Sequence, residues 1–394
     1  MPRVQRGAMQ RVLFWVLVLL ACSIHKNGSY LLLQWCVGLG LGALFIGYRI
    51  FQFVGLLPAL AFTYTLLNGI YMFGYEFNMY ATTSVPAHAQ MSLRFNALYS
   101  TLSVLCVGLI VTLLTSKERR AILHAVPIFT LANSLYVIIG AVFGFGMLPN
   151  GTGYSGLINY AGLNGCLIAI GIPSFFRYLR GWRVFSSACI GVCFLAVVLS
   201  KSSIPYGVLV VSVTAYYAHR KRRTLDINEL GVWICGTLLV GVFVERRGLF
   251  DSAGRFQAYK VFMSDWLDRG HYLFGNGLGS FIAMSRNIQA KHSFMVNEKG
   301  QGFFWSTLHS DWLQTLFELG LVGLVLYSVL FISCARRLWA VRSEYSSRLL
   351  ALLMGVAACA VFDYPARYFV LSTLLAFVAV GAYRMNEERR EEPS

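Results

Sequence analysis

Apolar runs of about twenty residues are the feature that most constrains this chain. A helix of that length crosses the hydrocarbon core of a bilayer, and short polar connections separate most of the runs. The sequence therefore predicts an all-α, polytopic membrane protein with about twelve transmembrane helices, forming a single membrane domain over 1–394. The predicted spans are 10–25, 30–48, 51–74, 95–115, 121–147, 155–176, 184–200, 203–219, 230–245, 312–333, 349–364 and 367–384.

Composition supports this class and excludes others. Hydrophobic residues make up 57% of the chain and charged residues only 13%, whereas a soluble protein carries roughly a quarter charged residues. A net charge of +16 is also typical of nucleic-acid-binding proteins. Here, however, the basic residues lie mostly between apolar runs and are not interleaved with aromatics on a polar surface. We therefore expect membrane lipids as partners and no nucleic acid.

The positions of the basic residues predict the topology. With the N-terminus in the cytoplasm, 21 of the 33 Lys and Arg residues fall on the cytoplasmic side and only 4 in the short outer loops. This asymmetry fits the positive-inside rule and places both termini in the cytoplasm. The N-terminus also resembles a signal peptide, with arginines before an apolar run. Because a second apolar run follows almost at once, we interpret it as an uncleaved first helix.

One connection is much longer than the others. It runs over 246–311, between the ninth and tenth predicted helices, and lies on the outer, periplasmic face. Long loops are uncommon in compact proteins and are usually functional. This one contains no cysteine, so it must keep its shape without disulfides. Aromatic and aliphatic residues recur among polar ones over 256–267, which predicts an amphipathic helix along the membrane surface.

A histidine lies at the end of this loop, just before the tenth predicted helix. His309 precedes Ser310, a good N-cap residue, and Asp311, which suits a first helical turn. The positive end of the helix dipole disfavours a charged imidazole at this place. A neutral histidine can accept a proton, as a general base must. An interfacial histidine with a purely structural role is the alternative interpretation.

The residues around this histidine resemble a known signature. His309-Ser310, followed by Gly320 and Gly323 at the spacing HSx9GxxG, is similar to the motif of the O-antigen ligase family. Members of that family belong to a wider group with O-antigen polymerases and related membrane oligosaccharide transferases. Arg255, Trp266 and the glycine run 275–279 resemble the preceding part of the same family region. The specific likeness covers roughly 250–325; elsewhere it is one of hydropathy and topology.

The resemblance implies a reaction and its partners. The donor would be a glycan linked to undecaprenyl diphosphate, and the acceptor a sugar hydroxyl of lipid A–core at the periplasmic face of the bacterial inner membrane. His309 would be the base for the attacking hydroxyl. Positive charge on the diphosphate would stabilise the leaving group, and Arg255 is the first choice because a planar guanidinium matches phosphate oxygens.

Further binding residues are assigned in the same way. Lys201, in Ser200-Lys201-Ser202, occupies the place where the family has an arginine. A lysine keeps the positive charge but cannot bind phosphate with two parallel hydrogen bonds, as arginine does. The alternative interpretation is an interfacial lysine whose side chain reaches towards water. Arg247 would bind donor phosphate, or else anchor the ninth helix at the headgroups. Trp266 and Gly277 are expected to contact substrate.

The sequence predicts no metal site and no cofactor, because the outer face offers no DxD or similar carboxylate pair. Asp265 and Asp268 share a helix face, which is more typical of a solvated surface. Glu318 lies two turns into a membrane helix, where a carboxylate is expensive. We expect it to face the bundle interior and to pair with a basic or hydroxyl group.

Two other functions remain open on the sequence alone. An O-antigen polymerase shares the donor and the architecture but uses a second lipid-linked glycan as acceptor. A transporter of lipid-linked oligosaccharides is of a different class, and such proteins often show internal repeats and ionisable residues in the middle of several helices. This chain shows no repeat, few charges in the middle of its helices and a large outer loop that holds the motifs, which favours the enzyme.

Overall fold

The computed structural model describes a set of helices that overlaps eight of the predicted spans. The residues that it describes are 3–23, 60, 61, 64, 65, 67, 68, 115–145, 153–158, 161–221, 255–277, 280, 281, 285, 288, 308–363 and 369–384. The predicted spans 30–48, 95–115 and 230–245, and most of 51–74, lie outside these residues. Within them the chain is helical and contains no β-strand.

The described helices agree with the hydropathy-based spans to within a few residues at most ends. They are α1 (Arg3–Ser23), α6 (Ser116–Phe143), α7 (Ala161–Gly171), the 3₁₀-helix η2 (Ile172–Arg180), α8 (Arg183–Leu199), α9 (Ile204–Lys221), α11 (Arg255–Arg269), α13 (Asp311–Ala340), α14 (Glu344–Phe362) and α15 (Phe369–Tyr383). The last four of these follow one another from the predicted large loop to the C-terminal region.

Four helices among the described residues are long and apolar enough to cross a membrane. They are Lys117–Phe143, Ala161–Leu179, Asp311–Ala340 and Glu344–Val361. A further two apolar helices are shorter, Ala8–Leu20 and Arg183–Leu199. This confirms an all-helical chain with the character of a membrane protein.

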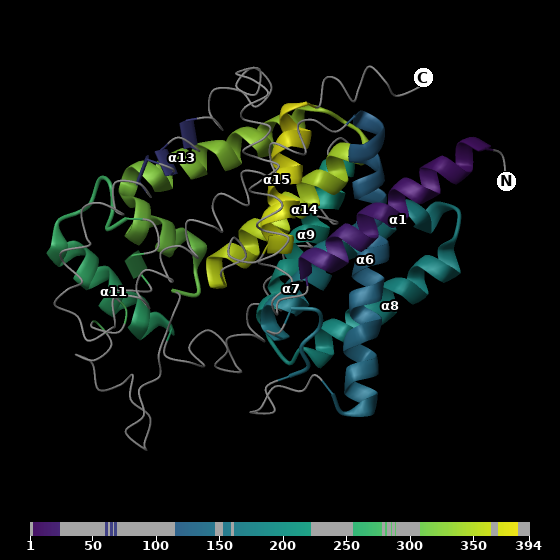
Figure 1. The fold of residues 1–394 in the computed structure, drawn as a ribbon, viewed down its shortest axis with the longest axis horizontal. Coiled ribbons are helices and arrows are strands. Elements are labelled where there is room, and N and C mark those ends of the chain that lie inside the picture. The colour runs from purple at the N-terminus through teal and green to yellow at the C-terminus, as the bar shows by residue number, and fades with distance from the viewer. Residues whose placement is uncertain are drawn as a thin grey trace.

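The bundle is built around α14. This helix packs most extensively against α9 and also contacts α7, α13 and α15. Its apolar window is 72% buried inside the protein, and that of the α7–η2 segment is 78% buried. Helices that are apolar on every side are expected at such central positions. Figure 1 shows α14 and α9 in the middle of the bundle, with α6, α8 and α1 beside them.

The outer surface of α13 is apolar and exposed. Leu321, Val325, Val329 and Ile332 are 42–56% exposed, and their spacing places them along one face of the helix. Only 28% of this helix's apolar window is buried in the protein. An exposed apolar stripe along a long helix is the surface expected against lipid chains, where the helix already satisfies its own backbone hydrogen bonds.

A second, smaller core lies outside the bundle, at the side where α11 meets the N-terminal part of α13 (Figure 1). It consists of the buried side chains Ala258, Phe262, Trp266, Phe281, Ile288, Leu308 and Phe317. The ring of Phe281 makes edge-to-face contacts with both Phe262 and Phe317. This small core, formed by aromatic and aliphatic packing, joins part of the predicted large loop to α13. The described cysteines lie elsewhere, buried in helices of the bundle and at the C-terminal part of α13.

Candidate functional site

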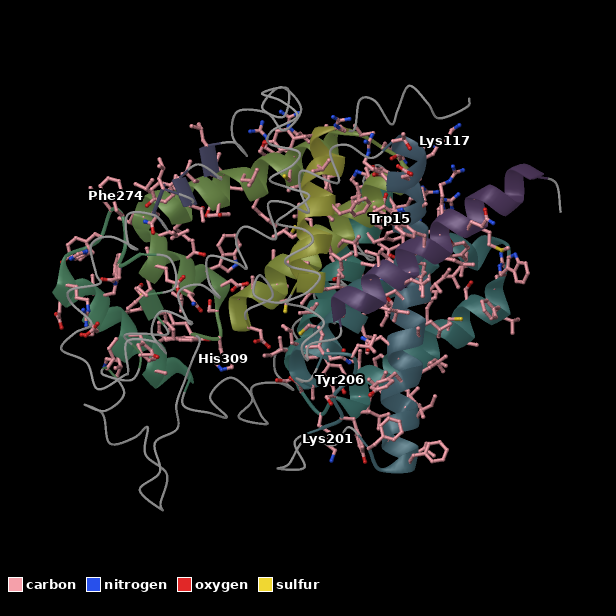
Figure 2. The ribbon with its side chains drawn as sticks, viewed as in Figure 1. Trp15, Lys117, Lys201, Tyr206, Phe274 and His309 are labelled. Atoms are coloured by element: carbon pink, nitrogen blue, oxygen red, sulfur yellow. The ribbon has the colours of Figure 1, made fainter. Side chains whose placement is uncertain are left out.

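The predicted base and the predicted phosphate-binding lysine share an unusual backbone conformation. Lys201 and His309 both have a φ of 50°, and no other described non-glycine residue has a positive φ. This left-handed region is disfavoured for residues with a Cβ and is enriched at functional sites, where surrounding contacts must enforce it. Figure 2 shows both residues towards one end of the molecule and Lys117 towards the other.

The backbone around His309 is attached to the end of α14. The Asp311 N–H donates to the Asp363 carbonyl at 3.1 Å, and the Ser310 hydroxyl donates to the Ala360 carbonyl at 3.4 Å. Ser310 also caps α13, because its side chain accepts from the Leu313 N–H at 3.4 Å. The start of one membrane helix and the end of the next therefore form one hydrogen-bonded unit.

This unit places the imidazole of His309 beside a buried carboxylate. Nδ1 of His309 lies 3.7 Å from Oδ1 of Asp363, and the Asp363 side chain is fully buried. The His309 side chain keeps 21% of its surface exposed, so it is still accessible from outside. The separation is longer than a hydrogen bond, so the contact is electrostatic. An accessible histidine beside a buried carboxylate can act as a general base, and the contacts of such bases often tighten only when substrate binds. Asp363 was not identified from the sequence as part of this site.

The helix α11 fixes the same residue from the other side. The Tyr259 hydroxyl donates to the His309 carbonyl at 2.9 Å, which supports the left-handed peptide. Tyr259 packs against the small core through its half-buried ring. The first residue of α11 is Arg255, as the sequence predicted for a helix opening near this point. Its side chain, and the whole of Arg247, lie outside what the structure describes.

Trp266 is a core residue in this structure. Its side chain is 5% exposed and its ring packs edge-to-face on Tyr272. The indole Nε1 finds no hydrogen-bond partner among the described residues. The contact of Trp266 with substrate stays a prediction. The structure shows a packing role, because the indole ring connects α11 to the segment 271–277.

A break in α13 was not expected from the sequence, which predicted one continuous helix over 312–333. Gly320 has φ 67° and ψ −168°, so the helical hydrogen bonding stops there. The segment 271–277 fills the gap. The N–H groups of Asn276 and Gly277 donate to the Phe317 and Glu318 carbonyls, and those of Leu321 and Val322 donate to the carbonyls of Tyr272 and Leu273, at 2.7–3.0 Å.

This contact explains two glycines, Gly320 of the HSx9GxxG pattern and Gly277 of the run 275–279. A Cβ on Gly320 would overlap the Leu273 carbonyl, and a side chain at its φ of 67° would be strained. Gly277, expected to contact substrate, has a φ of 99° and is buried where its N–H bonds to α13. The glycine of this pattern therefore marks a helix interruption about three turns after the candidate base.

Glu318 is buried, as expected, but the partner that the structure describes is different. The Gln314 carboxamide donates to Oε1 of Glu318 at 2.7 Å, a partner that was not expected. The same Gln314 accepts from the Leu308 N–H at 3.4 Å, next to His309. An amide can bridge a backbone donor and a carboxylate because it carries both an acceptor and donors. The described residues include no cluster of three or more His, Cys, Asp and Glu that could hold a metal.

Lys201 follows the last turn of α8 on a tightly packed turn. Ser200 is buried, and a Cβ on Gly153 would overlap its carbonyl. The Tyr154 N–H donates to the Leu199 carbonyl at 3.1 Å, and the Lys201 N–H to the Val198 carbonyl at 3.1 Å. The ammonium is thus exposed on a turn whose backbone is held by its neighbours.

The chain matches no protein-family model, and no characterised protein matches it significantly.

Proposed function

We propose that this protein is a glycosyltransferase of the O-antigen ligase type. It transfers a glycan from undecaprenyl diphosphate to a sugar hydroxyl of lipid A–core at the periplasmic face of a bacterial inner membrane. The proposal includes about twelve spans and two cytoplasmic termini. The observation that carries it is the accessible His309 imidazole, held 3.7 Å from the buried Asp363 carboxylate at the start of α13.

The proposed chemistry is an inverting or retaining substitution at the anomeric carbon. The acceptor hydroxyl oxygen forms a bond to this carbon while the bond from the carbon to the diphosphate oxygen breaks. His309 takes the hydroxyl proton on Nε2, the nitrogen on the far side of the ring from Asp363. General-base catalysis of this kind contributes about 10²–10⁴-fold. The leaving group is the lipid diphosphate.

Charge on the leaving diphosphate needs a cationic partner. Lys201 is favoured by its exposure and by the strained backbone that it shares with His309. Arg255 is favoured by its place at the start of α11, four residues before the Tyr259 that contacts His309. Arg247, Trp266 and Gly277 keep their proposed roles in donor binding. No metal and no cofactor take part in this proposal.

The test is a lipopolysaccharide gel of cells that depend on this protein for their O-antigen. His309→Ala is compared with His271→Ala, which removes an exposed histidine from the neighbouring 271–277 segment. The protein level of each variant is measured in the membrane fraction. The proposal expects bare lipid A–core and accumulated lipid-linked O-antigen for His309→Ala, and a normal ladder for His271→Ala.

Two results would overturn the proposal. Core capped by a single repeat would identify a polymerase, because ligation would then still occur. An unchanged ladder with His309→Ala would remove this residue from the mechanism and favour a transporter of lipid-linked oligosaccharides. Transport can be followed directly by the accessibility of the lipid-linked glycan on the outer face.

A further inference from the structure

Basic side chains from three elements meet at the opposite end of the bundle, the end where Lys117 lies (Figure 2). Arg120 and His124 come from α6, Arg177 from η2 and Arg348 from α14. We call these four residues the basic cluster. The imidazole of His124 lies within electrostatic range of the guanidinium groups of Arg348, Arg177 and Arg120. Arg348 is 1% exposed, whereas Arg177 is exposed, so the cluster reaches from the interior to the surface.

Arg348 is the residue that most needs an explanation. One of its terminal nitrogens donates to the Leu123 carbonyl, but its Nε is buried and has no hydrogen-bond partner among the described residues. No carboxylate within the described part of the chain forms an ion pair with it. An arginine cannot lose its charge, so burial without a counter-ion costs several kcal/mol. A buried guanidinium of this kind is typical of a site that an anion completes.

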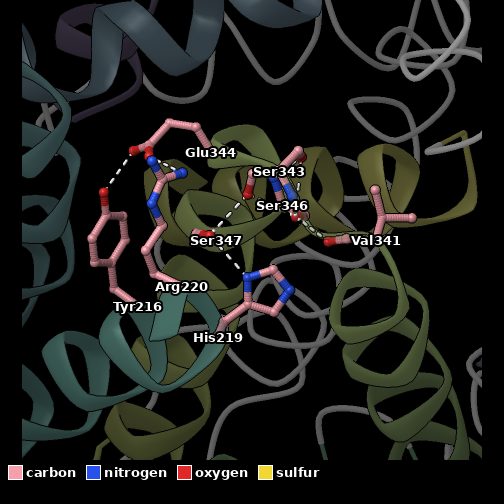
Figure 3. A network of polar contacts seen from close by, with 8 residues as sticks. All are labelled: Tyr216, His219, Arg220, Val341, Ser343, Glu344, Ser346 and Ser347. Carbon is pink, nitrogen blue, oxygen red and sulfur yellow. Dashed lines mark hydrogen bonds and ion pairs between the residues drawn. The ribbon is translucent and has the colours of Figure 1, made fainter. Parts of the chain in front are cut away.

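The acidic side chains described at this end are already engaged elsewhere. Glu344, in the first turn of α14, binds Arg220 at 2.8 Å and accepts from the Tyr216 hydroxyl at 2.6 Å, as Figure 3 shows. Glu118 closes the capping box of α6 with Thr115. Figure 3 also shows His219 bonded to Ser347, one residue before Arg348. These contacts tie α9 to α14. Glu344 lies within electrostatic range of Arg348 but forms no ion pair with it, because its short contacts go to Arg220 and Tyr216.

The outer part of the cluster presents hydrogen-bond donors. Arg177 donates to Nε2 of His124 at 3.4 Å, so this imidazole is neutral and its Nδ1–H faces the Tyr178 oxygen at 2.7 Å. Because the Tyr178 oxygen accepts in this contact, the hydroxyl hydrogen of Tyr178 can be donated to another group. Arg348 lies within electrostatic range of both Arg177 and Tyr178. Guanidinium and hydroxyl donors gathered around a buried positive charge are the groups that bind phosphate oxygens.

We propose that the basic cluster, together with Tyr178, is a binding site for a phosphate-bearing anion, distinct from the site at His309. Two sources carry this chemistry, a phospholipid headgroup and a soluble phosphate. Basic groups between transmembrane helices on the cytoplasmic side recognise anionic lipid headgroups, and the charge distribution predicts that this end faces the cytoplasm. The site holds α6, η2 and α14 together through the bound anion.

The experiment is thermal unfolding of the detergent-purified full chain, with added ligand at constant ionic strength. The ligands are phosphatidylglycerol, zwitterionic phosphatidylcholine and inorganic phosphate. Arg177→Gln removes an exposed donor of the cluster, and Arg336→Gln is the matched control, because it removes an exposed arginine on α13. Arg348→Met removes the buried charge while keeping most of the side-chain volume.

A ligand that binds only the folded state raises the melting temperature. We expect phosphatidylglycerol to stabilise the wild type and Arg336→Gln more than phosphatidylcholine does. Arg177→Gln should weaken the apparent affinity by about tenfold, the value of one charge-assisted hydrogen bond. Arg348→Met should unfold at or above the wild-type temperature without ligand, since a buried unpaired charge is gone, and should respond to no anion.

The outcomes separate the two sources. Stabilisation by phosphatidylglycerol alone identifies a lipid site, and equal stabilisation by inorganic phosphate, with the same dependence on the variants, identifies a soluble phosphate as the ligand. The proposal is overturned if neither ligand stabilises the wild type. It is also overturned if Arg336→Gln loses the response as fully as Arg177→Gln, because the effect would then come from diffuse surface charge.

Discussion

Replacing Asp363 by Asn tests the role of the carboxylate beside His309. The change removes the negative charge but keeps the side-chain shape, and the Asp363 carbonyl still accepts from the Asp311 N–H. During proton transfer the imidazole becomes positively charged, and the neighbouring carboxylate stabilises that charge. At the observed 3.7 Å, two unit charges in the effective dielectric of a protein near its surface interact by about 4 kcal/mol.

Solvent screens part of this interaction energy, because 21% of the His309 side chain is exposed. Taking about half of it, roughly 2 kcal/mol, predicts a loss of about 10- to 100-fold in kcat. The assay is transfer of glycan from a purified lipid diphosphate donor to lipid A–core in detergent. Since the carboxylate acts through the base and not on the donor, the KM for the donor should stay unchanged.

Asp268→Asn is the control, because it removes an exposed carboxylate from α11. It should leave both kcat and KM as they are. A wild-type kcat for Asp363→Asn would refute the reasoning, as would a raised donor KM with an unchanged kcat. The first result would make the 3.7 Å contact incidental, and the second would place Asp363 in donor binding.

Three further substitutions test the surrounding structure. Gly320→Ala places a side chain at a φ of 67° and should lower the stability by at least about 1–3 kcal/mol in thermal unfolding, whereas Gly191→Ala, in open space on α8, should cost nothing. Phe262→Ala empties the centre of the small core and should cost about 3–5 kcal/mol, seen as faster amide exchange in α11 while α14 stays protected. Tyr259→Phe removes the hydrogen bond to the His309 carbonyl; it should cost about 0.5–1.5 kcal/mol and lower kcat, and full activity would show that this contact does not position the base.

The membrane helices were predictable from the sequence for a physical reason. In lipid each helix must satisfy its own backbone hydrogen bonds, so hydrophobic length alone marks it. The predicted span 184–200 corresponds to the helix Arg183–Leu199, and the predicted span 203–219 corresponds to the helix Ile204–Lys221. The N-cap at Ser310 was also found correctly, since capping depends on neighbours in the chain.

Long-range pairings could not be predicted in this way. A glycine is tolerated inside a helix, so nothing at Gly320 alone indicates that the helix stops there. The interruption exists because 271–277 supplies the missing partners from more than forty positions earlier in the chain. Asp363 likewise reaches His309 only through the packing of α13 on α14, and nothing in the neighbouring sequence indicates this contact.

The interruption of α13 has a consequence for biogenesis. The carbonyls of Phe317 and Glu318 are satisfied by the N–H groups of Asn276 and Gly277 and not by the next helical turn. Without 271–277, these carbonyls have the Leu321 and Val322 N–H groups as the partners of an ordinary helical turn, so α13 alone can cross the membrane as one continuous helix. The break in α13 should therefore form only after insertion, when 271–277 docks and exchanges helical hydrogen bonds for bonds between the two segments.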